Sequence, residues 1–244
     1  MQIVVSEILT SYEELGNGKD TILILPGWKR LAQEWVPVAK ELSKKYRVVL
    51  LNLPGFGATQ NFKKIAGVYE YANFVRDFLS KVKIKKCIVL GHSFGGRLGL
   101  ILASENDLAE KLILVDSAGI EKKGFIAKTI RIFKKIFHPM FVLSPQQIKT
   151  KVGNTIGSED YKNSGEMRET FKKIVNQNLT GLFHRVKIPT LIIWGEEDKS
   201  LPVSQARIFK NGIKKSTVRI AWGAGHDPHL DDSEQFLAIL SEIL

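Results

Sequence analysis

Short apolar runs rich in β-branched residues recur along the chain, and most end at a glycine, a proline or an acidic residue. They cover residues 21–25, 47–51, 87–90, 112–115, 190–194 and 217–221. Such nearly continuous runs are typical of parallel strands that are covered on both faces. Helical patterns fill most of the gaps, at residues 35–45, 69–82, 202–211 and 233–244. This alternation predicts an α/β protein with a doubly wound, mostly parallel sheet.

The two ends of the chain extend this pattern. We expect residues 2–16 to form an antiparallel hairpin at the edge of the sheet, closed by the turn signal Gly16-Asn17-Gly18. The last helical pattern places Phe236, Leu240 and Ile243 on one apolar stripe, with the spacing i, i+4 and i+7.

One stretch interrupts the alternation of strands and helices. Between Glu121 and His184 no strand-like run ends in a turn, and helical patterns separated by polar loops replace it. We interpret residues 121–184 as a helical cap inserted into a core made of residues 1–120 and 185–244. Residues 121–185 hold thirteen Lys and Arg against five Asp and Glu, so most of the formal net charge of +11 is concentrated there.

Composition restricts the classes of protein that fit. The chain has 244 residues, 44% of them hydrophobic, which is ordinary for a globular domain. The one cysteine, Cys87, excludes an intramolecular disulfide and lies in an apolar run, where we expect a buried, inert thiol. No apolar segment reaches the roughly 20 residues that span a bilayer, and the first residues lack the pattern of a signal peptide, so a cytoplasmic location is expected.

The basic charge does not by itself indicate a nucleic-acid partner. The sequence has no RNP-like aromatic motif, no zinc-ligand spacing and no recognisable DNA-binding motif. A lysine-rich solvated surface is the preferred interpretation, and we expect no cofactor and no metal.

A glycine-flanked serine follows the run at 87–90. The segment Gly91-His92-Ser93-Phe94-Gly95 matches G-x-S-x-G, in which small neighbours allow a sharp strand-to-helix turn that exposes the serine hydroxyl. The pattern alone is weak, but here a predicted strand precedes it and a helical pattern at 97–103 follows it. Ser93 is therefore the candidate nucleophile.

An acid and a base follow two later strands. Asp198 comes shortly after the run at 190–194, and His226 follows the glycine turn after the run at 217–221. A serine hydroxyl needs a base to take its proton, and the chain order Ser, Asp, His is the one expected of this architecture. We therefore predict a triad of Ser93, Asp198 and His226.

Neighbouring residues leave alternatives for both roles. His229 could replace His226 as the base, although His226 is preferred because it comes directly after the glycine turn. The competing acids are Glu196, Glu197 and, less favoured, Asp116. The remaining histidines, expected to be structural or on the surface, are His92, His138 and His184.

Backbone N–H groups are expected to hold the oxyanion of the reaction. One comes from Phe94, the residue after the nucleophile, and the other from Trp28 in the loop after the run at 21–25.

With these motifs assembled, the chain resembles the α/β-hydrolase superfamily that includes carboxylesterases, lactonases and hydrolases of meta-cleavage products. The matching segments are residues 12–16, 25–28, 53–57, 91–96, 195–198 with Pro202, and 223–226. The resemblance covers nearly the whole chain and implies that residues 121–184 form the helical cap of that superfamily.

Three positions distinguish the chain from parts of that superfamily. Asn52 stands where an aspartate usually begins the D-x-P-G-x-G loop, and Pro26 stands where many members have histidine before the oxyanion-loop glycine. The serine at position 93 separates the chain from haloalkane dehalogenases and most epoxide hydrolases, which use aspartate there.

The predicted cap contains a basic amphipathic helix. Its apolar positions are Ile126, Ile130, Phe133 and Phe137, and its basic positions are Lys128, Arg131, Lys134 and Lys135. We prefer a lid over the active site; the alternative is weak contact with an anionic membrane or an acidic carrier such as acyl carrier protein. The residues expected to line a substrate pocket are Phe125, Phe133, Phe137, Met140 and Phe141, with Phe171.

The expected activity is that of a carboxylesterase-type serine hydrolase, which cleaves a small-molecule ester, lactone or thioester through an acyl-enzyme at Ser93. A carbon–carbon bond hydrolase of meta-cleavage-type diketones with the same triad is the first alternative. A receptor-like member that binds its ligand and hydrolyses it only incidentally is the second.

Overall fold

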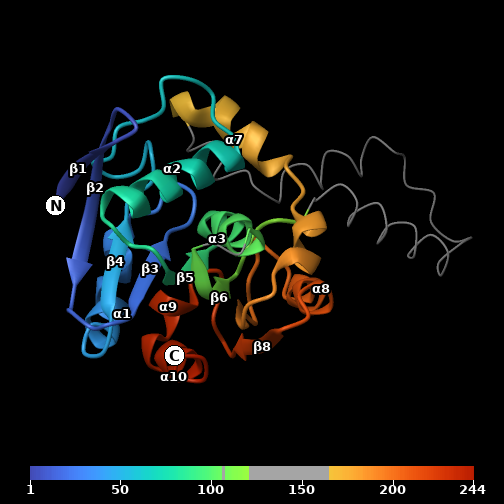
Figure 1. Cartoon of the computed structure of the whole chain (residues 1–244). Coiled ribbons are helices and arrows are strands. Elements are labelled where there is room, and N and C mark those ends of the chain that lie inside the picture. Colours follow the sequence, from blue (N-terminus) through green and yellow to red (C-terminus); the bar gives the residue numbers. More distant parts are fainter. Residues whose placement is uncertain (106–107, 121–164) are drawn as a thin grey trace, which may run out of the picture.

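The computed structural model describes residues 1–105, 108–120 and 165–244, and these form an α/β fold around one sheet (Figure 1). The strands are β1 (Gln2–Val5), β2 (Ile8–Leu15), β3 (Thr21–Leu25), β4 (Arg47–Leu51), β5 (Cys87–His92), β6 (Ala109–Val115), β7 (Thr190–Gly195) and β8 (Ser216–Ala221). The α-helices are α1 (Val36–Leu42), α2 (Val68–Lys81), α3 (Phe94–Ser104), α7 (Arg168–Val175), α8 (Ser204–Gly212), α9 (Pro228–Asp231) and α10 (Ser233–Leu240). Short 3₁₀ helices are η1 (Ala32–Trp35), η2 (Gly165–Met167) and η3 (Thr180–Arg185).

The sheet confirms the predicted architecture. Its strand order is β1-β2-β4-β3-β5-β6-β7-β8. All pairs from β4 to β8 are parallel, whereas β1 pairs with β2 and β2 with β4 in antiparallel orientation. Every residue of β3 is buried, which explains why the central runs are apolar without alternation.

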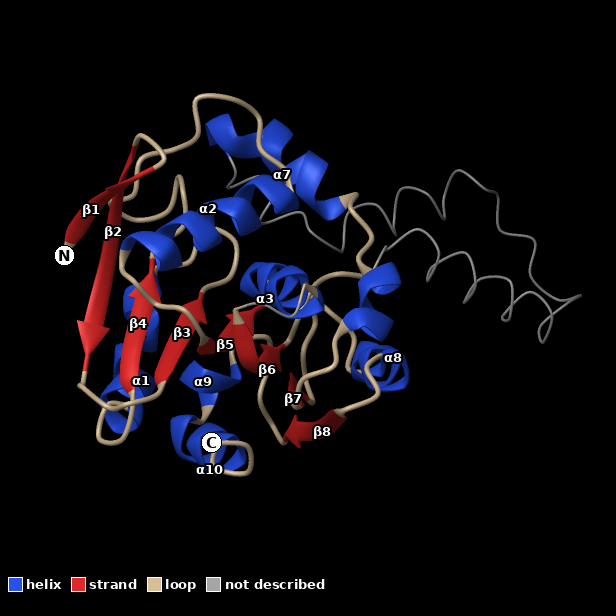
Figure 2. Ribbon diagram, viewed as in Figure 1, coloured by secondary structure: helices blue, strands red, loops and turns tan. Residues whose placement is uncertain are grey.

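Helices cover both faces of the sheet (Figure 2). One core cluster joins α2, α3, α7 and α8 to one face, and the second joins η1, α1 and α10 to the other. Successive side chains of a strand point to opposite faces, so Val89 lies in the first cluster and Leu90 in the second. Cys87 is buried as expected, and burial raises the pKa of its thiol to about 12.

The N-terminal hairpin is present, but the turn predicted to close it is wrong. Val5 pairs with Ile8, so Ser6 and Glu7 form the turn. Their φ values of 48° and 65° are those of a type I′ turn, which most often contains Asn-Gly. Gly16-Asn17-Gly18 instead joins β2 to β3, where a Cβ on either glycine would overlap backbone carbonyl oxygens of residues 43–46. Close approach of backbone segments, and not hairpin closure, requires these glycines.

The last helix is shorter than predicted. α10 ends at Leu240, and Ile243 packs against the same core cluster as Phe236 from beyond the helix. The carbonyl groups of this final segment have partners elsewhere, because the Tyr46 hydroxyl donates to Leu244 at 2.8 Å and the Lys111 amino group donates to Ile243.

Part of the predicted cap, residues 165–184, is described. Met167, Phe171 and Ile174 are buried in the same core cluster as α2 and α3, and α7 lies beside α2 (Figure 1). The buried guanidinium of Arg97, in α3, donates to the carbonyl oxygens of Ile174 at 3.0 Å and Gln177 at 2.7 Å. Residues 121–164 lie outside the described residues, so the boundaries of the cap stay a prediction.

Within the part of the chain that the structure describes, no helix combines the length and the apolarity needed to cross a bilayer.

Candidate active site

The sheet has a topological switch point at β3. β4 follows β3 in the chain and lies on one side of it, whereas β5 lies on the other. In open parallel sheets, ligands bind outside the carboxyl ends of the strands at such a point. The segments after β3 and β5 meet there, and the Gly95 N–H donates to the Pro26 carbonyl oxygen at 3.1 Å.

Ser93 lies in a strained turn between β5 and α3. Its φ of 49° and ψ of −106° are unusual for a residue with a side chain. A Cβ on Gly91 would lie 2.6 Å from the carbonyl carbon of Gly95, so a larger residue does not fit there. The Ser93 N–H donates to the Val115 carbonyl oxygen at 2.9 Å, which holds the turn against β6.

A continuous chain of hydrogen bonds joins Ser93, His226 and Asp198. The Ser93 Oγ lies 3.0 Å from Nε2 of His226, and Nδ1 of His226 lies 2.7 Å from Oδ2 of Asp198. With Asp198 as acceptor, Nδ1 carries the imidazole proton and Nε2 is left to accept from the serine hydroxyl. The three residues come from separate strand ends, after β5, β7 and β8.

The environment of Asp198 favours its ionised form. Burial raises the pKa of this carboxyl group, but hydrogen bonds from His226 and from the Leu201 N–H outweigh burial, so the pKa is lowered overall. Its Oδ1 accepts the backbone N–H groups of Ser200 and Leu201 at 2.7 and 2.9 Å. Asp198 is therefore a fixed negative charge beside the imidazole.

Three of the alternatives, Glu196, Glu197 and His229, lie outside the hydrogen-bonded chain from Ser93 to Asp198. Glu196 is exposed and accepts the Gly223 N–H at 3.1 Å, and the Glu197 side chain is exposed. His229 is buried in α9 and stacks on Trp35, with ring centroids 3.7 Å apart. Neither glutamate hydrogen-bonds to an imidazole among the described residues.

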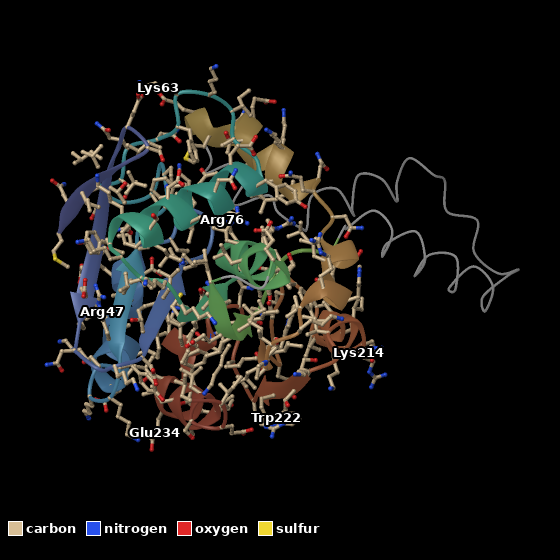
Figure 3. The ribbon with its side chains drawn as sticks, in the orientation of Figure 1. Arg47, Lys63, Arg76, Lys214, Trp222 and Glu234 are labelled. Atoms are coloured by element: carbon tan, nitrogen blue, oxygen red, sulfur yellow. The ribbon has the colours of Figure 1, made fainter. Side chains whose placement is uncertain are left out.

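Two side chains, those of Gln235 and Asp231, bind the backbone of the turn that carries His226. Trp222, directly after β8, is 66% exposed and lies at the molecular surface (Figure 3). Its backbone N–H donates to the side-chain oxygen of Gln235 at 2.7 Å. The Gly225 N–H donates to Asp231 at 2.8 Å. These bonds fix the position of His226 although the turn is at the surface.

Trp28 and Phe94, the predicted oxyanion donors, lie together. Their ring centroids are 5.3 Å apart, and both side chains are buried. Phe94 is the first residue of α3, so its N–H has no acceptor within the helix. Phe171, one of the expected pocket residues, has its ring 5.2 Å from Trp28. Both predicted donor residues are therefore adjacent to the turn at Ser93.

Asn52, which replaces the aspartate of the related loop, is buried and hydrogen-bonded. Its side-chain oxygen accepts the Ala32 N–H at 2.9 Å, and its carbonyl accepts the Thr59 hydroxyl at 2.9 Å. An amide meets these contacts without a buried charge.

His92 belongs to the site, although the sequence suggests only a structural or surface residue. Burial, together with the nearby His226, lowers the pKa of His92 to about 3, so its ring is neutral. Its Nε2–H donates to the His226 carbonyl oxygen at 2.8 Å and thereby fixes the backbone at His226. Its place inside the turn at Ser93 is the sequence signal that could have indicated this role.

Asp116 is the second residue that sequence reasoning undervalued. It follows β6 and has no exposed surface. Among the described residues, one group has the spacing of metal ligands, and it consists of Asp116, Asp198 and His226. Because Asp198 and His226 already bond to each other, we interpret this group as a hydrogen-bonded network.

The expected pocket residues of the cap cannot be placed. Phe125, Phe133, Phe137, Met140 and Phe141 lie outside the described residues, as do His138 and the basic amphipathic segment. Contact of that segment with a membrane or an acidic carrier therefore stays a prediction. His184 is exposed, as expected.

Comparison with known proteins places this geometry in context. A family model described as the alpha/beta hydrolase family matches residues 22–239. An uncharacterised protein of Mycobacterium tuberculosis is 28% identical over 259 residues, covering 91% of this chain and 74% of the relative. A monoacylglycerol lipase of Mus musculus is 24% identical, covering 93% and 76%. A meta-cleavage product hydrolase from Pseudomonas fluorescens has a TM-score of 0.75 at 17% identity, covering 99% and 96%.

Proposed function

The chain belongs to the alpha/beta hydrolase family, and from that premise we propose that it is a serine hydrolase that cleaves a carboxylic ester. Ser93 attacks the acyl carbon while His226 takes its proton, and His226 then gives that proton to the leaving alcohol. Asp198 orients the imidazole and stabilises its charged form. The hydrogen-bonded chain from Ser93 through both ring nitrogens of His226 to Asp198 is the observation that supports this proposal most.

In the proposal, the N–H groups of Phe94 and Trp28 hold the oxyanion. The positive end of α3 points to the same place, since Phe94 begins that helix. Loss of one such donor typically costs roughly 3–4 kcal/mol of transition-state stabilisation. The acyl-enzyme that forms on Ser93 is then hydrolysed by water, with His226 as the base.

The substrate class is broader than simple esters. Lactones and thioesters pass through the same acyl-enzyme, and the name of the lipase relative favours an acyl substrate. A carbon–carbon bond hydrolase is the second candidate, because a structural neighbour is a meta-cleavage product hydrolase. At 17% identity that likeness concerns the fold alone, so we rank this activity below ester hydrolysis.

The test combines labelling and turnover. A fluorophosphonate should modify Ser93 of the intact protein, as located by peptide mass spectrometry, and Ser93→Ala should lose both labelling and hydrolysis of activated acyl esters. Asp198→Asn should lower turnover by about 10⁴-fold. Ser117→Ala is the matched control, because this buried hydroxyl bonds only to the Ala118 carbonyl among the described residues.

Three outcomes would contradict the proposal. Ester hydrolysis by Ser93→Ala at the wild-type rate would exclude Ser93 as the nucleophile. Turnover of a dienoic diketone but of no ester, lactone or thioester would favour the carbon–carbon activity. A chain that resists labelling at Ser93 would favour the receptor-like alternative.

A further inference from the structure

A second buried acid lies behind the proposed triad. Asp116 follows β6 as Asp198 follows β7, and these strands are parallel neighbours with Val115 opposite Ile193. One carboxyl oxygen of Asp116, one of Asp198 and a ring nitrogen of His226 all lie within 4.8 Å of one another. Ester hydrolysis as proposed above assigns no role to Asp116.

The hydrogen bonds around the two acids leave one oxygen without a donor. Oδ1 of Asp116 accepts the Gly195 N–H at 2.9 Å, whereas its Oδ2 is buried and has no donor among the described residues. Oδ1 of Asp198 accepts from Ser200 and Leu201, and its Oδ2 accepts from His226 and can take one more donor. A buried, unpaired carboxylate oxygen is costly, and a proton on Asp116 converts it into a donor directed at Asp198.

The electrostatic environment also favours the protonated form of Asp116 over that of Asp198. Burial raises the pKa of Asp116 well above its usual value, and the nearby charge of Asp198 raises it further. Two further titratable groups near it are His226 and Asp227, both after β8, and Arg30 pairs with Asp227 at 3.2 Å. Two adjacent buried carboxyl groups cannot both ionise readily, and Asp198 has the better-stabilised charge.

We propose that Asp116 is a positioning residue: its neutral carboxyl group donates a hydrogen bond to Asp198 and holds that carboxylate toward Nδ1 of His226. This inference rests on the proposed function, because in that function the Asp198–His226 pair activates Ser93. Asp116 is thus a supporting donor and not a substitute for the triad acid.

Two substitutions test whether Asp116 acts as a hydrogen-bond donor or through a negative charge. Asp116→Asn places an amide that can accept from Gly195 and donate to Asp198, whereas Asp116→Ala removes both contacts. We expect the rate of fluorophosphonate labelling of Ser93 to stay within about threefold of wild type in Asp116→Asn and to fall about tenfold or more in Asp116→Ala. Equal losses in both variants would overturn the proposal.

The pH dependence of labelling distinguishes a neutral Asp116 from an ionised one. A neutral Asp116 adds no charge near His226, so the acid limb of the rate profile should coincide in wild type and Asp116→Asn. If Asp116 were ionised, Asp116→Asn would remove a negative charge and shift that limb to lower pH. Melting temperatures of all variants ensure that rates are compared in the folded state.

A spectroscopic measurement is independent of Ser93 reactivity. The infrared difference spectrum of wild type minus Asp116→Asn at neutral pH should contain the carbonyl band of a protonated carboxylic acid. Absence of that band would overturn the proposal even if Ser93 is labelled. Its presence in a protein that resists labelling would support the neutral Asp116 and refute the proposed hydrolase activity.

Discussion

Gly95 is the residue at which the loop after β3 and the turn at Ser93 come closest. Its N–H donates to Pro26, and a Cβ at this position would overlap the carbonyl oxygen of Leu25 and lie 2.8 Å from that of Pro26. These are backbone atoms of a fully buried strand and its end, so they cannot move aside as a flexible side chain does. The close approach brings the two proposed oxyanion donors together.

We therefore predict that Gly95→Ala damages the site. The added methyl group should lower the free energy of unfolding by about 1–3 kcal/mol or more and slow labelling of Ser93. Gly181→Ala is the control, because a Cβ there meets nothing within 4 Å and the change should stay within about 0.5 kcal/mol. Urea denaturation and labelling rates measure both variants; wild-type values for Gly95→Ala would contradict the predicted clash.

The residues of the proposed triad are easier to predict from the sequence than the contacts of their neighbours. Ser93, Asp198 and His226 each follow a strand end, so their proximity can be predicted from the parallel sheet alone. Which of His226 and His229 faces Ser93 depends on the orientation of two imidazole rings that are only three residues apart in the chain. In the structure the ring of His229 stacks on Trp35, far away in sequence, whereas the ring of His226 faces Ser93. No spacing rule contains that contact.

Among the elements, the central strands are the easiest to predict from the sequence, and the turn of the N-terminal hairpin is the hardest. Buried apolar runs predict the ends of the parallel strands to within three residues, because burial on both faces requires that composition. The hairpin turn at Ser6-Glu7 carries no glycine or asparagine, and its left-handed geometry cannot be predicted from these residues. The more typical turn signal, Gly16-Asn17-Gly18, instead allows the close approach of this segment to the backbone of residues 43–46.

The strained hairpin turn predicts a stabilising substitution. Glu7 has a φ of 65°, which costs a non-glycine residue roughly 1 kcal/mol, and its ion pair with Lys63 is at the surface and adds little. Glu7→Gly should raise the melting temperature by about 2–4 °C. Glu7→Ala also removes the ion pair but keeps the Cβ, so it should bring no gain. A similar rise in both variants would show that strain is not the cause.

Over the whole molecule, two buried histidines connect stability with pH. Burial lowers the pKa of His92 to about 3 and that of His229 to about 2. Both folded-state values lie below the ordinary value of about 6.5, so between these values the unfolded chain binds more protons. The contribution of these two neutral histidines to stability is therefore fully present above about pH 6.5 and is lost progressively as the pH falls toward their folded-state values.

His229→Phe should weaken this acid sensitivity. Phenylalanine can keep the stack on Trp35, and neither ring nitrogen of His229 has a partner among the described residues. Between about pH 6 and pH 4.5, the free energy of unfolding should fall by up to about 1.4 kcal/mol less per pH unit than in wild type. Urea denaturation at several pH values measures the slopes, with the exposed His184→Phe as control; parallel slopes in wild type and His229→Phe would refute the prediction.

Arg97 has a consequence for how this chain can change by mutation. Its guanidinium, in the helix that begins at Phe94, holds residues 174–177 through two carbonyl oxygens and through no side chain of that segment. Backbone carbonyls are present whatever residue occupies a position. Position 97 is therefore constrained, whereas the side chains of α7 that face away from the core are free to diversify, in evolution or in a designed library, without loosening the anchor.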